Sequence, residues 1–107
     1  WVTGFDIPFL TRRAIILGVK LPDSASWPRQ PKAWDCFDTM IKWAGLRDRI
    51  SLDDLCFALG IEGKDGFDGA DVAPAYFAGE HEKIKDYQAS DVRKVQQIVS
   101  RFQVVGF

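Results

Sequence analysis

The sequence predicts one small, mostly helical domain that spans residues 1–107. Three segments carry apolar residues at helical spacing, and most of the prediction rests on them. A chain of 107 residues with 47% hydrophobic and 13% aromatic residues is long enough to build a single packed core. No internal repeat or low-complexity tract interrupts it. We therefore expect one domain without an internal boundary.

The first helix is expected from Asp6 to about Val19, where the apolar residues of one face are Phe9, Leu10, Ala14 and Leu17. Asp6 is expected to be the N-cap, because its carboxylate can accept from the unpaired amides of the first turn. Pro8 fits that turn, since its missing N–H would be unpaired anyway. Gly18 should end the helix.

The middle of the chain predicts a loop followed by short elements. Residues 20–32 are rich in Pro, Ser and charge, which is typical of an extended surface loop. We expect a short strand over residues 33–37 and then a helix over Asp38–Trp43 that Gly45 ends.

The second half predicts three further helices. Ser51 and Asp54 have the spacing of a capping box, and a helix should run from there to Gly60 with Leu52, Leu55, Ala58 and Leu59 on its apolar positions. Residues 60–69 hold four glycines among charged residues and predict a loop, and residues 71–79 should include a short helix. The longest helix is expected from about Ile84 to Phe102, with a stripe of Ile84, Val92, Val95, Val99 and Phe102.

Charge and cysteine content narrow the function classes only partly. A formal charge of −1 and a pI of about 5.7 give no global attraction to nucleic acid, so such a contact would need a local basic surface. Cys36 and Cys56 form no CxxC pair, and with a single histidine they do not make a zinc set. Free thiols and the lack of a long apolar run predict a cytoplasmic protein without a membrane span.

Tyr87 and Asp91 form the first candidate site. They lie four residues apart on the last predicted helix, which places a phenol and a carboxylate on one face. The carboxylate could hold a hard divalent cation, and the phenol could orient a water that the metal activates. The alternative is that Tyr87 packs in the core and Asp91 is solvated. Asp6 is similarly ambiguous, because an Asp in the first turn of a helix is usually a cap.

The glycine-rich loop and the basic residues carry weaker signals. The acids at 65, 68 and 71 are three apart, so the loop does not have the alternating ligands of an EF-hand. Its glycines and Lys64 could approach a nucleic-acid backbone, although a plain flexible turn is the alternative. His81 has no catalytic partners at suitable spacing, and the basic residues, Arg12 among them, are scattered along the chain.

Four segments together carry a family resemblance: Gly4-Phe5-Asp6-Ile7-Pro8-Phe9-Leu10, Ser51-Leu52-Asp53-Asp54-Leu55, Gly60-Ile61-Glu62-Gly63-Lys64 and Tyr87-Gln88-Ala89-Ser90-Asp91-Val92. In this order they resemble the predicted 3′→5′ exonucleases related to the exonuclease domain of family B DNA polymerases. The resemblance extends from Gly4 to about Phe102. It implies an α/β, RNase H-like exonuclease fold, of which this chain would be mostly the helical C-terminal two thirds, with little of the central sheet.

The resemblance also implies a site. The Phe-Asp pair that opens a helix is the family's second motif, and Tyr-x-x-x-Asp is its third, which matches Asp6, Tyr87 and Asp91. Asp6 and Asp91 would then ligand two divalent metals, Mg²⁺ or Mn²⁺, while Tyr87 positions the attacking water. The substrate would be a single-stranded DNA 3′ end, with RNA also possible. Phe5, Arg12 and Lys64 are the residues we expect to contact nucleic acid.

The sequence departs from the family pattern at its start. The first motif, an Asp-x-Glu on the first strand, should precede Asp6, where only five residues stand, and the usual Asn before the Phe-Asp pair is replaced. We expect the chain to begin inside a domain and to be inactive alone, with a preceding segment or a partner chain completing the sheet and the site. The alternative function is a catalytically degenerate, nuclease-derived nucleic-acid-binding or interaction domain. An unrelated small helical domain with accidental motif matches is a third interpretation.

Overall fold

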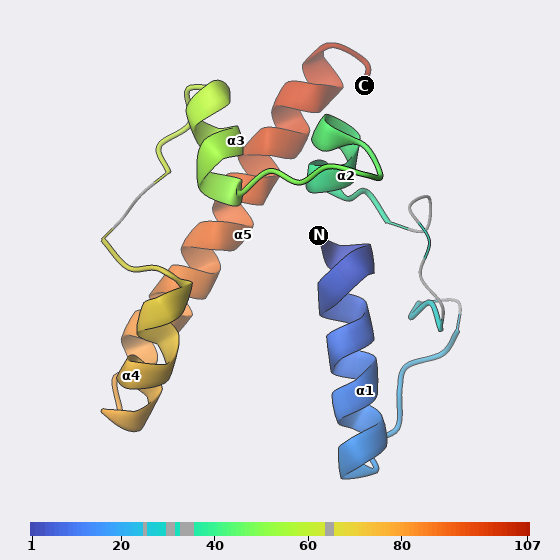
Figure 1. Ribbon diagram of the computed structural model, residues 1–107, viewed down its shortest axis with the longest axis vertical. Coiled ribbons are helices and arrows are strands. Elements are labelled where there is room, and N and C mark those ends of the chain that lie inside the picture. Colours follow the sequence, from blue (N-terminus) through green and yellow to red (C-terminus); the bar gives the residue numbers. More distant parts are fainter. Residues whose placement is uncertain (25, 30–31, 33–35, 64–65) are drawn as a thin grey trace. The chain divides into compact units, whose positions relative to one another are not determined.

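The computed structural model describes residues 1–24, 26–29, 32, 36–63 and 66–107. These residues form helices and loops, and none of them belongs to a strand (Figure 1). They divide into two compact units, Trp1–Arg49 and Ile50–Phe107, and each is described by itself. The assignment of residues 1–107 to a single domain stays a prediction. Within the described ranges, no helix has both the length and the apolar character needed to cross a membrane.

The first unit begins with a π-helical segment, Val2–Asp6, that runs directly into α1, Ile7–Leu17. Gly18 ends α1 with a φ of 67°, as predicted, because this left-handed conformation costs glycine little. The prediction that Asp6 is the N-cap is wrong. Asp6 has helical backbone angles (φ −62°, ψ −51°), and its side chain makes no capping hydrogen bond, because the helical path already starts at Val2.

The predicted apolar face of α1 is only partly covered. Ile7 is buried, but Phe9, Leu10 and Leu17 keep 48%, 51% and 62% of their surface exposed. The indole of Trp27 in the following loop donates to the Thr11 hydroxyl at 3.0 Å, so the loop is held to the helix by a polar contact. The apolar spacing thus predicted the helix without predicting what covers it.

The helix α2, Thr39–Ala44, confirms the prediction for this part of the chain, with Asp38 as N-cap and Gly45 as C-cap. Most of the predicted strand, residues 33–35, lies outside the described residues, as do residues 25 and 30–31 of the predicted loop. Cys36 and Phe37, which are described, belong to no strand.

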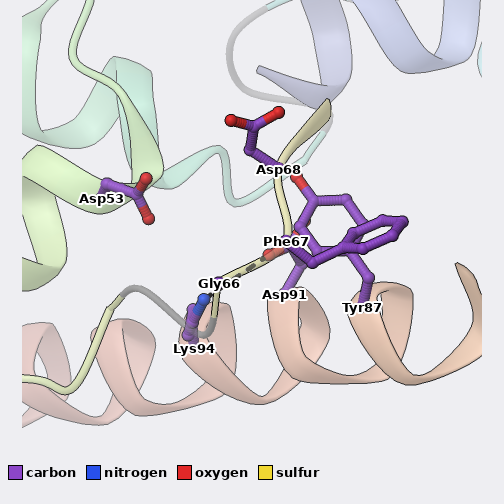
Figure 2. A pocket seen from close by; sticks show the side chains of 7 residues that line it. All are labelled: Asp53, Gly66, Phe67, Asp68, Tyr87, Asp91 and Lys94. Atoms are coloured by element: carbon purple, nitrogen blue, oxygen red, sulfur yellow. Dashed lines mark ion pairs between the residues drawn. The ribbon is translucent and has the colours of Figure 1, made fainter. Parts of the chain in front are cut away.

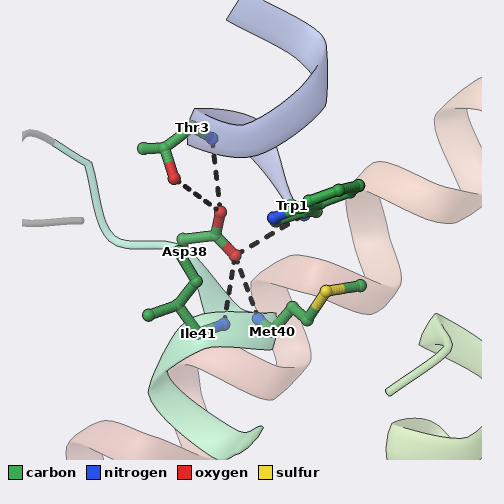
Figure 3. Close-up of polar contacts among 5 residues, drawn as sticks. All are labelled: Trp1, Thr3, Asp38, Met40 and Ile41. Carbon is green, nitrogen blue, oxygen red and sulfur yellow. Dashed lines mark hydrogen bonds and ion pairs between the residues drawn. The ribbon is translucent and has the colours of Figure 1, made fainter. Parts of the chain in front are cut away.

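Asp38 joins the two ends of the first unit (Figure 3). Its Oδ1 accepts from the backbone N–H groups of Met40 at 3.1 Å and Ile41 at 3.3 Å, which caps α2. Its Oδ2 accepts from both the backbone N–H and the hydroxyl of Thr3, each at 3.3 Å. Asp38 is 2% exposed, so these contacts replace water around a buried carboxylate.

The second unit contains α3 (Leu52–Ala58), a 3₁₀ turn (Gly69–Asp71), α4 (Val72–Phe77) and α5 (His81–Val104). The Ser51 hydroxyl accepts from the Asp54 N–H at 3.0 Å, as the capping pattern predicted. At 24 residues, α5 is the longest described helix, which confirms that prediction. Helices α3 and α4 both contact α5, and the core consists of Leu55, Cys56, Ile61, Ile98 and Phe102.

The buried face of α5 differs from the predicted stripe. Phe102 is buried as expected, but Val92 and Val95 are 49% and 36% exposed. Lys94 and Ile98 are buried instead, at 6% and 0% exposure. The predicted stripe was based on the valines. The buried face instead carries polar residues over the middle of the helix, and hydrophobic periodicity cannot detect a buried face made of polar residues.

Candidate functional site

Tyr87, Asp91 and Lys94 lie along one face of α5 and line a pocket of about 300 Å³ in the second unit (Figure 2). Spacings of four and three residues bring side chains to the same side of a helix, which explains their alignment. The other described residues that line it are Asp53 in the first turn of α3 and Gly66, Phe67 and Asp68 in the loop before the 3₁₀ turn. The pocket therefore lies where three segments of the second unit meet.

Tyr87 is half-buried, and its phenol interacts with the Asp91 carboxylate. Burial raises the pKa of Tyr87 above its ordinary value, and the negative charge of Asp91 and a hydrogen bond to that carboxylate raise it further. At neutral pH the phenol is therefore protonated, so its O–H is a possible donor to the neighbouring Asp91 carboxylate. Its ring also contacts Phe67, with ring centroids 5.1 Å apart and planes tilted by 52°. Tyr87 is thus part of the pocket wall and does not belong to the buried apolar core.

Lys94 places a positive charge beside Asp91. Its Nζ lies 3.8 Å from Asp91 Oδ1, and its side chain is 8% exposed while that of Asp91 is 32% exposed. Removing an ammonium group from water is costly, and a neighbouring carboxylate offsets part of that cost. Sequence reasoning missed Lys94, although its position three residues after Asp91 puts it on the same helix face.

The acids of this pocket offer oxygen atoms, which are the ligands that hard divalent cations prefer. Asp53, Asp68 and Asp91 all line it. However, nowhere in the described ranges do three or more His, Cys, Asp or Glu side chains group closely enough to hold a metal ion. Asp91 can supply one ligand, but the described residues do not by themselves complete a metal centre.

The other residues predicted for the site belong to the first unit or are not described. Asp6, Phe5 and Arg12 are exposed in the first unit, with Asp6 in the π-helical segment and Arg12 on α1. The Phe5 ring stacks on Phe9, with centroids 5.6 Å apart. Lys64 lies outside the described residues. Their predicted roles in metal and nucleic-acid binding stay predictions.

Cys56 lies close to the pocket but has the properties of a core residue. It is free and fully buried, and burial raises the pKa of its thiol from the ordinary value of 9.0. Lys94 acts in the opposite direction, but its effect is smaller than that of burial. The side chain is therefore a neutral thiol at physiological pH, and it is not an activated nucleophile.

Comparison with known protein families gives a match over nearly the whole chain. The sequence model of a family described as predicted 3′-5′ exonucleases related to the exonuclease domain of PolB matches residues 2–106. No curated protein and no solved structure matches the chain significantly. The matched range runs through both units and includes Asp6, Tyr87 and Asp91.

Proposed function

The chain belongs to the family of predicted 3′-5′ exonucleases related to the exonuclease domain of PolB, and we propose that it hydrolyses the terminal phosphodiester of single-stranded DNA 3′ ends. The observation that carries this proposal is the pairing of Tyr87 with Asp91 in the wall of one pocket. We further propose that the described helices are the helical part of an α/β, RNase H-like domain. The sheet of such a domain would come from outside the described residues or from a partner chain.

In this proposal Asp91 and Asp6 are ligands of divalent metal, Mg²⁺ or Mn²⁺, and further ligands come from outside the described residues. Metal ions at such a site would polarise the phosphodiester and make water a stronger nucleophile. The Tyr87 O–H can donate a hydrogen bond to the Asp91 carboxylate, which leaves the phenol oxygen free to accept a hydrogen bond from a water molecule. Tyr87 thereby orients both the carboxylate and the water.

The neighbourhood of Lys94 also supports a second candidate, a catalytically degenerate domain that binds nucleic acid or a protein partner. An ammonium 3.8 Å from Asp91 Oδ1 reduces the negative charge that this carboxylate presents to a metal. Substituting Lys94→Met distinguishes the two candidates. Weak Mn²⁺ binding that becomes tight in this variant would favour degeneration, whereas loss of cleavage would favour a nuclease that needs Lys94.

A cytoplasmic location is part of the proposal. Cys36 and Cys56 are both free, and Cys56 is fully buried. Free cysteines are typical of reducing compartments.

The proposal is tested with full-length protein and a 5′-labelled single-stranded oligonucleotide in Mn²⁺ or Mg²⁺. Asp91→Asn should lower the cleavage rate on the order of a thousandfold, and Tyr87→Phe by roughly ten- to a hundredfold, as losses of single catalytic groups do. Glu82→Gln is the matched control, because its side chain is 83% exposed on the same helix and lines none of the pockets described. A folded Asp91→Asn variant that cleaves at the normal rate would refute the assignment.

The metal ligands are tested separately by Mn²⁺ titration with NMR line broadening as the readout. If Asp6 and Asp91 share the metal site, the backbone amides at both positions should broaden at the same Mn²⁺ concentration. Broadening at Asp91 alone would remove Asp6 from the site. No broadening in the full-length protein at either position would contradict the metal proposal.

A further inference from the structure

A second pocket lies beside the first and shares part of its wall. It has a volume of about 560 Å³, and both pockets are lined by Gly66, Phe67 and Tyr87. The other described residues that line it are Lys83, Asp86, Ser90 and Arg93, all on α5. At about 100° per residue, Tyr87 lies between these residues and Asp91 around the helix, and Lys94 lies next to Tyr87. One helix thus lines two adjacent pockets, with the Phe67–Tyr87 ring pair common to both.

The two pockets differ in charge. Among the described residues, three carboxylates and one ammonium line the first pocket, which gives a formal charge of −2. In the described lining of the second pocket, Lys83 and Arg93 against Asp86 give a formal charge of +1. The chain has a formal charge of −1 overall, so this pocket is the kind of local basic surface that a polyanion would need.

We propose that the second pocket binds the phosphate backbone of a single-stranded polynucleotide next to its 3′ end, with Arg93 and Lys83 as the phosphate ligands. This inference rests on the proposed function and deepens it, because it states where the strand lies when its terminal phosphodiester is at Asp91. Phe67 lines both pockets, and in this proposal a base of the strand stacks on its ring where the strand passes from one pocket to the other.

The residues suit these tasks individually. The Arg93 guanidinium can bind phosphate through two parallel hydrogen bonds, and Ser90 adds a hydroxyl donor. Lys83 pairs with Glu80 at 2.8 Å, but their side chains are 65% and 43% exposed, and such surface pairs are weak enough to exchange for a phosphate. Phe67 is held against Tyr87 and offers the flat apolar surface that bases prefer.

The test is oligonucleotide binding by full-length protein in EDTA, where cleavage cannot occur, with fluorescence anisotropy of a labelled single strand as the readout. The double variant Lys83→Gln/Arg93→Gln should bind about tenfold more weakly at low salt. Its plot of log affinity against log salt should flatten by about 0.7 for each phosphate that the variant no longer neutralises. Phe67→Leu should also weaken binding, because it removes the stacking surface.

Lys85→Gln is the matched control for charge. Lys85 lies on the same helix with a side chain 72% exposed, and it lines neither pocket. This variant should bind within about twofold of wild type. Equal losses in Lys85→Gln and in the double variant, or an unchanged salt slope, would overturn the inference. Binding of inorganic phosphate or a mononucleotide as tightly as the strand would overturn it too.

Two further measurements separate this inference from the proposed function and identify the strand. In a cleavage assay the double variant should raise KM and leave kcat nearly unchanged, whereas Asp91→Asn should lower kcat. If Asp91→Asn abolishes turnover but the double variant has normal KM, the nuclease assignment holds and the phosphate pocket is wrong. Because the ligand is phosphate, DNA and RNA strands of one sequence should lose affinity equally, and a loss confined to one of them would contradict the assignment.

Discussion

The ion pair between Asp91 and Lys94 should stabilise the fold by about 1–2 kcal/mol, measured as a coupling energy. At 3.8 Å the interaction between two unit charges is about 4 kcal/mol for an effective dielectric constant of about 20. The Asp91 side chain is 32% exposed, so solvent screens the pair from one side, and fully exposed pairs contribute only about 0.2–1 kcal/mol. Because Lys94 is nearly buried and Asp91 is partly exposed, we expect the coupling energy to lie between the value for exposed pairs and the full interaction of the two charges.

The coupling is measured with a cycle of four proteins: wild type, Asp91→Asn, Lys94→Met and the double variant. Asn keeps an oxygen that can accept from Tyr87, and Met keeps the stem of the lysine, whose side chain is 8% exposed. Urea unfolding followed by circular dichroism gives the free energy of unfolding for each protein. The coupling should change little between low and high salt, because screening acts weakly on a buried charge.

A coupling energy below about 0.3 kcal/mol would mean that the two substitutions act independently, which is the limit for sites without contact. The Asp91 carboxylate would then not be paired with Lys94 in solution. In that case Lys94 would not lower the charge that Asp91 presents to a metal, and the second candidate function would lose its support.

Three further predictions concern the buried Asp38 and the two cysteines. Asp38→Ala should destabilise the first unit by about 2–4 kcal/mol, because it removes the N-cap of α2 and the acceptor for Thr3. Hydrogen exchange of the α2 amides should accelerate in this variant. Asp38→Asn should destabilise the unit less. Iodoacetamide at pH 8 should alkylate Cys36 in the native protein and Cys56 only after unfolding. Because the folded-state pKa of Cys56 is raised, the thiol contributes its full stabilisation below pH 9, and this stabilisation is lost as pH rises through the raised pKa. The free energy of unfolding of Cys56→Ala should therefore fall less at alkaline pH than that of the wild type.

Helix ends that depend on neighbouring residues could be predicted from the sequence. Ser51 caps α3 through a residue three positions away, and Gly18 and Gly45 end their helices with positive φ. The start of the first helix could not be predicted in this way. Thr3 donates to Asp38, 35 residues later, and that distant carboxylate helps to hold the chain in a helical path before Asp6. The residues of the first turn alone do not reveal a contact with a residue so far away in the sequence.

The spacing of Tyr87 and Asp91 predicted their shared face correctly, but neither their surroundings nor the burial of Lys94 followed from it. Phe67 and Asp68 reach the pocket from a loop whose glycines predicted a turn or a contact with a nucleic-acid backbone, but no pocket wall. The inward face of α5 could be found only once α3 was seen to pack against it. Hydrophobic periodicity fails at such places because polar residues are buried there in contact with one another.

Tyr87 on α5 lines both pockets and therefore forms part of the wall between them. Phe67 contacts this ring from the loop before the 3₁₀ turn, so the loop is held at the boundary between the acidic lining and the basic lining. A strand that bound along α5 would cross that boundary at the ring pair. Its terminal phosphodiester would then lie near Asp91 while the preceding backbone lay near Arg93. Because both sets of residues are fixed on one helix, the spacing between backbone binding and chemistry would be set by the helix itself and would not depend on the placement of a flexible loop.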